Sequence, residues 1–99
     1  MRKYLKMNIK LKSRSGVAVQ YDGTNIQKIA DIFNLDYKEY KCVTLWNGKF
    51  YPDVRITDNN YIDKDLIAGD WVYASHNSDL VEIISEEEFE KYWEKDDER

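Results

Sequence analysis

The sequence contains no acid and base paired in a recognisable catalytic motif. The chain has one histidine, His76, and one cysteine, Cys42. A catalytic or metal-binding histidine needs a partner that orients it, and His76 forms no recognisable motif with one. Asp58, Asp63 and Asp65 lie close together, but no glycine stands in mid-loop and no glutamate closes a twelve-residue calcium loop. We therefore expect no catalytic residue, no metal site and no cofactor, and predict that the protein is not an enzyme.

A predicted β-hairpin carries the residue types best suited to recognition. Residues 41–46 and 49–57 flank Asn47-Gly48, which favours a two-residue turn because both residues tolerate positive φ. Such a turn fixes the register of the two strands. Pro52 favours an edge strand or a bulge at its position. The predicted cross-strand pairs are Trp46 with Lys49, Leu45 with Phe50, Thr44 with Tyr51 and Val43 with Pro52.

One face of this hairpin is a candidate partner-binding surface. Tryptophan, tyrosine and arginine dominate protein interfaces because they bury large areas at small entropic cost, and they also stack on bases or on a small ring. A second interpretation stays open, in which a helix covers the face and makes it an inner layer of the core. The face carries Thr44, Trp46, Lys49, Tyr51, Asp53 and Arg55, and Tyr61 follows shortly after it.

Two patterns before the hairpin indicate a strand and a helix. Residues 5–11 alternate apolar side chains with lysine or asparagine, which is typical of a strand with a lysine-rich face. We interpret it as an edge strand kept soluble by lysine rather than as a nucleic-acid surface, because the whole chain is acidic. Residues 17–21 predict the next strand. Thr24 and Gln27 match a capping box, and the helix that begins there has an apolar stripe of Ile26, Ile29, Ala30 and Phe33.

The stretch around Gly69 is predicted to anchor the fold. Gly69 suits a tight turn, and residues 70–75 and 80–84 read as strands joined by the loop 76–79. Trp71 and its neighbour Val72 point to opposite faces, so this strand should lie inside a sheet. Ser85 and Glu88 form a second capping box, followed by an aromatic stripe. The expected structural residues are Gly69, Trp71, Phe89 and Trp93.

Length and charge limit the remaining possibilities. The chain has 99 residues, a net charge of −4 and a single cysteine, so it forms no internal disulfide. Its charge is polarised, because residues 1–14 carry +6 and residues 86–99 carry −5. Neither a signal peptide nor a membrane-spanning segment is recognised, so we expect a cytoplasmic protein. We predict one α+β domain over 1–99: a mainly antiparallel, twisted sheet of about five to six strands, an amphipathic helix after the second strand and a C-terminal helix. Residues 1–3 and 95–99 should fray.

Two blocks of the sequence resemble a widespread group of small phage and prophage proteins. The first block is residues 17–21 with Gly23, Asn25, Ile29 and Ala30, and the second is residues 69–72 with residues 89–91 and Trp93. In that group a strand ending in Gln-Phe or Gln-Tyr leads into a short helix, and a Gly-Asp-Trp hairpin precedes a short C-terminal segment. The loop at 76–79 and the segment 85–88 depart from the group's usual pattern. The Asn47-Gly48 hairpin is an elaboration, and we expect it to carry what is particular to this protein.

Two function classes follow from these observations. The first is a phage accessory protein that binds and inhibits a host protein, such as a component of antiviral defence, in the cytoplasm of the infected cell. A variant of it has the acidic C-terminal helix imitate nucleic acid. The second is a module that sequesters a small molecule such as a signalling nucleotide, for which Lys49, Arg55 and Tyr61 are the nearest candidates. Nucleic acid and membrane are not expected partners, and the sequence leaves the oligomeric state open.

Overall fold

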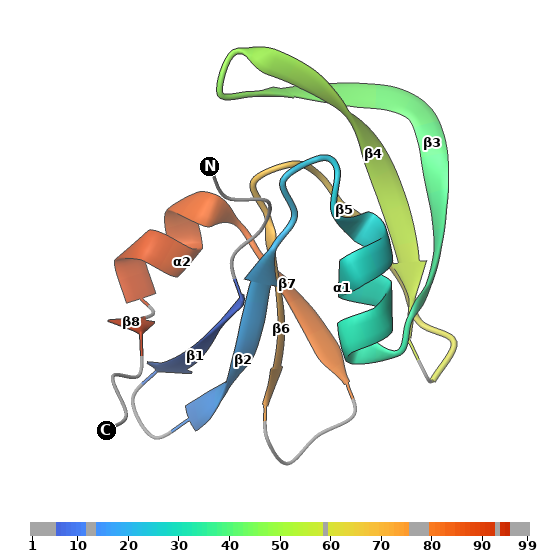
Figure 1. The fold of residues 1–99 in the computed structure, drawn as a ribbon. Coiled ribbons are helices and arrows are strands. Elements are labelled where there is room, and N and C mark those ends of the chain that lie inside the picture. Colours follow the sequence, from blue (N-terminus) through green and yellow to red (C-terminus); the bar gives the residue numbers. More distant parts are fainter. Residues whose placement is uncertain (1–5, 12–13, 59, 76–79, 93, 96–99) are drawn as a thin grey trace.

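The computed structural model describes residues 6–11, 14–58, 60–75, 80–92 and 94–95, with side chains for 16–58, 60–75 and 80–91. Its strands form two antiparallel sheets (Figure 1). The larger sheet has the order β7-β6-β2-β1-β8, and the smaller has the order β3-β4-β5. The larger sheet contains β1 (Lys6–Leu11), β2 (Arg14–Gln20), β6 (Trp71–Ser75), β7 (Val81–Ile84) and β8 (Glu94–Lys95). The smaller contains β3 (Asp36–Trp46), β4 (Lys49–Thr57) and β5 (Asp63–Leu66).

Two helices complete the fold, α1 (Ile26–Phe33) after β2 and α2 (Glu86–Tyr92) after β7. The predicted α+β class with mainly antiparallel sheets is confirmed. The predicted single sheet is wrong, because the chain leaves the larger sheet after α1 and builds a separate sheet before it returns as β6. Neither helix has the length and apolar composition that crossing a membrane requires.

The larger sheet has a hydrophobic layer on each face. Trp71, at one end of β6, is stacked on Phe89 of α2 with ring centroids 3.9 Å apart. Val72, the next residue, faces the other way into the core shared by α1 and the smaller sheet. β6 is therefore buried on both faces, as its sequence predicts, and the pairs Trp71–Ile84 and Val72–Ile83 have the predicted register. The shared core includes Val19, Tyr21, Ile29, Val54, Ile56, Leu66 and Val72.

The two predicted capping boxes have different outcomes. Ser85 accepts the backbone N–H of Glu88 at 3.1 Å, which is the predicted cap of α2. Thr24 instead donates to Asp22 at 2.8 Å, and α1 begins one residue later than a Thr24 cap would place it. Asn25 occupies the N-cap position, and its side chain ties the loop to β2 by donating to the carbonyl of Gln20 at 2.8 Å.

The lysine-rich strand is not an edge strand. β1 lies between β2 and the short β8, and its residue Ile9 pairs with Lys95 of β8. Residue 95, which we also expected to fray, lies in β8, where residues 94 and 95 give β1 a second neighbour. The remaining residues that we expected to fray, 1–3 and 96–99, lie outside the described part of the chain, and so does the side chain of Trp93.

Candidate interaction surface

The predicted hairpin forms with the predicted register. Asn47 and Gly48 have φ values of 51° and 85°, so both turn residues adopt the left-handed conformation that a two-residue turn requires. The first strand is longer than the predicted 41–46, because β3 already begins at Asp36. The cross-strand pairs at the tip are Trp46–Lys49, Leu45–Phe50, Thr44–Tyr51 and Val43–Pro52.

The surroundings of the hairpin's two faces change along its length. Val54 and Ile56, near the base, are fully buried, whereas Phe50, on the same side of β4, is 66% exposed. The β3–β4 ladder shifts register between Glu39 and Val43, and Figure 1 shows both strands arching over the rest of the molecule. A bulge bends a strand and increases its twist. The face that lines the core at the base of the hairpin therefore turns outward at its tip.

The predicted binding face turns toward the body at the tip. The Nε1 of Trp46 donates to Glu86 Oε1 at 3.0 Å, and the indole lies against Gly69, where an added Cβ would come 2.8 Å from Nε1. Tyr51 lies against Gly23, where an added Cβ would overlap its ring. The rings of Trp46 and Tyr51 meet edge to face with centroids 6.2 Å apart. Both side chains are half-buried and pack against the core, but they lie against the loop residues Gly69 and Gly23 rather than under a helix.

Glu86 fastens the hairpin tip to two other parts of the fold. While Oε1 accepts from Trp46, Oε2 accepts from the side-chain amide of Gln20 at 3.1 Å. The same amide nitrogen donates to the carbonyl of Gly69 at 3.0 Å. We call Gln20, Trp46 and Glu86 the clasp. It connects the tip of the hairpin with β2, with the turn before β6 and with the first residue of α2.

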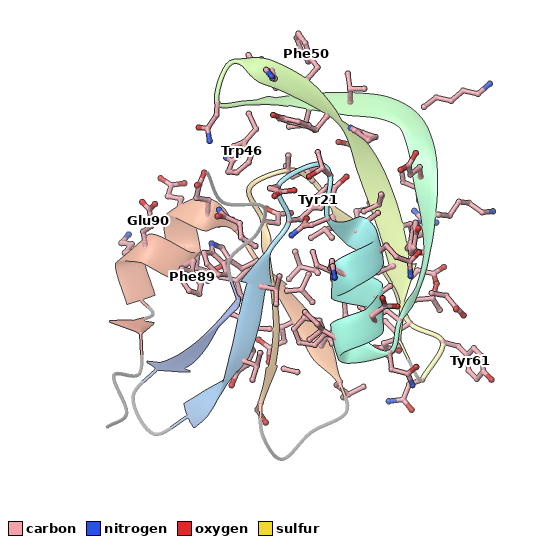
Figure 2. All side chains as sticks on the ribbon, in the orientation of Figure 1. Tyr21, Trp46, Phe50, Tyr61, Phe89 and Glu90 are labelled. Atoms are coloured by element: carbon pink, nitrogen blue, oxygen red, sulfur yellow. The ribbon has the colours of Figure 1, made fainter. Side chains whose placement is uncertain are left out.

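The other predicted site residues do not join Trp46 and Tyr51. Arg55 lies near the base of the hairpin, where its Nε is 3.2 Å from Asp65 Oδ1 and its guanidinium lies 5.1 Å from the centroid of the Tyr40 ring. Lys49 is exposed at the tip. Tyr61 is 88% exposed in the loop after β4, at the far end of the hairpin from Phe50 (Figure 2). The face that the sequence groups together is thus divided between the tip and the base.

The outward face of the tip carries three large apolar side chains. Val43, Leu45 and Phe50 are 55%, 58% and 66% exposed. Leu45 and Phe50 form a cross-strand pair, and Val43 lies on the same side of β3 as Leu45, so the three are neighbours. Figure 2 shows Phe50 directed away from the molecule while Trp46 points toward it. We call these three residues the outer patch.

The contacts beneath the tip place polar groups in a poorly solvated region. Burial, with smaller contributions from the nearby carboxylates of Glu86 and Asp53, raises the pKa of Asp70 to about 6. The backbone N–H of Ile67 donates to Asp70 Oδ2 at 3.2 Å and lowers its pKa in part. Burial, with a contribution from neighbouring carboxylates, also raises the pKa of Tyr21 to about 12, and its hydroxyl donates to the carbonyl of Pro52 at 2.8 Å. The tip is therefore supported by a specific set of hydrogen bonds.

The described residues offer weaker candidates for small ligands. A hollow of about 330 Å³ beside Arg55 is also lined by Lys38 and Tyr40, but Asp36 and Asp63 contribute opposite charges. No group of three or more His, Cys, Asp or Glu side chains within the described residues is arranged to hold a metal ion. Asp58 instead closes its own turn, because its Oδ1 accepts the N–H of Ile62 at 3.0 Å. The prediction for His76 falls outside the described residues.

The sequence contains a signal for the outer patch. Both faces of the hairpin tip carry large apolar side chains, and a small domain buries a smaller share of its surface than a large one. The sequence gives no signal that Trp46 and Glu86 are partners, because they are 40 positions apart. Each also fits its own element, Trp46 the hairpin and Glu86 the first turn of α2. Comparison of the chain with protein-family models, curated proteins and solved structures finds no match.

Proposed function

We propose that this protein is a non-enzymatic accessory protein that binds another protein through the outer patch. The observation that carries the proposal is the exposure of Val43, Leu45 and Phe50, each more than half exposed and all on one face of the tip. An exposed cluster of large apolar side chains is typical of a protein-binding surface. At the hairpin tip, the outer patch lies on the face opposite to the one that the sequence favours, which carries Trp46 and Tyr51.

The clasp supports this proposal because it fixes the tip. A two-stranded ribbon that extends from a domain is marginally stable by itself. Here the Trp46 indole is bonded to Glu86, and the Tyr51 ring lies against Gly23. A tip held in one position loses less conformational entropy when it binds, which favours affinity. The contacts of the inner face therefore hold the outer patch in one position for binding.

The resemblance to small phage proteins leads us to propose a host protein as the partner. Binding would then inhibit it, and a component of antiviral defence is the target that we favour. The alternative of a sequestered signalling nucleotide receives less support. Arg55 is already paired with Asp65, and Lys49 begins β4 at the tip whereas Tyr61 lies in the loop beyond the other end of β4. A thermal-shift screen against nucleotides tests that alternative, because a ligand at 100 times its Kd raises stability by about 2.7 kcal/mol.

Affinity capture with matched variants tests the proposed binding function. The tagged wild-type protein, the double variant Leu45→Ser/Phe50→Ser and the control Tyr61→Ser are each exposed to the same bacterial extract. Tyr61 is 88% exposed, so its substitution removes an exposed aromatic ring away from the outer patch. We expect a stoichiometric partner with the wild type and with Tyr61→Ser, and none with the double variant. The proposal fails if the wild type recovers no such partner or if the double variant retains it.

A further inference from the structure

The charge of the hairpin tip is opposite to that of the whole protein. Residues 40–52 contain two lysines, Lys41 and Lys49, and neither aspartate nor glutamate, although the chain has a net charge of −4. Both lysines are exposed. The nearest carboxylate along β4 belongs to Asp53, which accepts the hydroxyl of Thr44 at 2.6 Å. Lys49 belongs to the face of Trp46 but is exposed next to the turn, so a partner that seats on the outer patch meets positive charge at its edge, which favours carboxylates on the partner.

The size of the outer patch favours a short segment over a second folded domain. A fully exposed aromatic side chain offers only about 150 to 250 Å² of contact area. Three side chains that are 55% to 66% exposed therefore fall short of the roughly 800 Å² per partner in a standard interface between domains. The same comparison disfavours a second copy of this chain, whose tip would also bring Lys41 and Lys49 against like charges.

β3 supplies the additional contacts that a short segment needs. In the order β3-β4-β5, the described part of β3 has β4 as its one neighbouring strand, so its other edge presents backbone N–H and C=O groups. An extended peptide can add to such an edge through main-chain hydrogen bonds, and alternate side chains then extend one face of the sheet. Beside residues 43–45, those side chains would lie next to Val43 and Leu45.

Resting on the proposed function, we infer that the partner contributes an extended acidic segment with apolar side chains at alternate positions. The segment adds to the open edge of β3 as a strand. Its apolar side chains contact Val43, Leu45 and Phe50, and its carboxylates lie near Lys41 and Lys49. An anionic lipid surface is disfavoured as the occupant, because a membrane would face the acidic first turn of α2 as well as the tip that the bond from Trp46 to Glu86 holds beside it, whereas a segment along β3 contacts the tip alone.

A random peptide library displayed on a neutral carrier tests this inference. It is selected in parallel on the wild type, on Lys41→Glu/Lys49→Glu and on Leu45→Ser/Phe50→Ser, after thermal unfolding confirms that each variant is folded. We expect the wild type to enrich peptides that combine Asp or Glu with alternating apolar residues. The lysine double variant should bind those peptides about tenfold more weakly or worse and should instead enrich Lys and Arg. The serine double variant should bind neither set.

The other outcomes separate the inference from the proposed function. The wild type could instead enrich apolar peptides that have no excess of Asp or Glu and that do not bind Leu45→Ser/Phe50→Ser. This result would overturn the inference of an acidic segment, but it would still support the outer patch as a binding surface. Peptides that bind the serine double variant as well as the wild type overturn both. If no peptide is enriched, the inference is overturned. Sedimentation of the wild type, but not of the serine double variant, with vesicles of phosphatidylcholine and phosphatidylglycerol overturns it in favour of a lipid surface.

Discussion

Asp70→Asn should stabilise the protein at neutral pH and reduce the pH dependence of its stability. The carboxyl group lies beneath the hairpin tip, where burial, Glu86 and Asp53 raise its pKa from 3.8 to about 6. A raised pKa means that the folded state binds the proton more tightly than the unfolded state does. The stability that the protonated form contributes is fully present below about pH 3.8 and is lost as the pH rises through about 6.

The expected size follows from the change in proton affinity. A tenfold change in that affinity corresponds to about 1.4 kcal/mol, so a pKa rising from 3.8 to about 6 corresponds to about 3 kcal/mol. Because Asp70 is only partly buried, water screens the effect, and about 1 to 2 kcal/mol is the value we expect. Asparagine keeps an oxygen that can accept the Ile67 N–H, so the variant removes the charge and retains the hydrogen bond.

Urea unfolding between pH 4 and pH 8 measures this effect. The free energy of unfolding of Asp70→Asn relative to wild type should increase by about 1 to 2 kcal/mol from pH 4 to pH 8, with most of the change between pH 4 and pH 6. Asp31→Asn, an exposed substitution in α1, is the control and should show no such change. A difference between Asp70→Asn and wild type that is constant with pH would refute the argument that burial raises the pKa of Asp70.

Three further substitutions test the contacts that hold the fold. Trp46→Phe removes the indole N–H that donates to Glu86, so it should cost about 1 kcal/mol in urea unfolding and increase amide hydrogen exchange within residues 43–50; unchanged exchange there would contradict the role of the clasp. Tyr21→Phe removes the 2.8 Å bond to the Pro52 carbonyl and should cost about 1 kcal/mol in the same assay, and a neutral effect would contradict that assignment. Trp71→Ala should cost roughly 3 to 5 kcal/mol, because Trp71 is 5% exposed and stacked on Phe89, and a stable, fully folded variant by circular dichroism would show that this contact is not structural.

Local patterns predicted much of the secondary structure. Asn47-Gly48 determines its turn from two residues alone, and the register of β3 against β4 from the turn to Val43–Pro52 follows by counting. Trp71 and Val72 predict a strand buried on both faces, since large apolar side chains alternate there with no polar face. The apolar spacing in α1 likewise predicts its buried stripe of Ile26, Ile29 and Ala30.

The remaining features depend on long-range contacts. A period of two shows that Leu45 and Phe50 share a face, but not whether that face is covered, and the bulge between Glu39 and Val43 exposes it. Thr24 matches a capping box, yet Asp22 binds its hydroxyl instead. The bond from Trp46 to Glu86 joins residues on different elements, and no spacing rule relates them. The candidate site therefore required the structure, even though its hairpin did not.

Hydrogen exchange of the protein, alone and in complex with the partner recovered by affinity capture, tests most directly whether the outer patch binds another protein. We predict that new protection from exchange is concentrated within residues 42–50, which include Val43, Leu45 and Phe50. Protection confined to other segments, with residues 42–50 exchanging as fast in the complex as in the free protein, would contradict it.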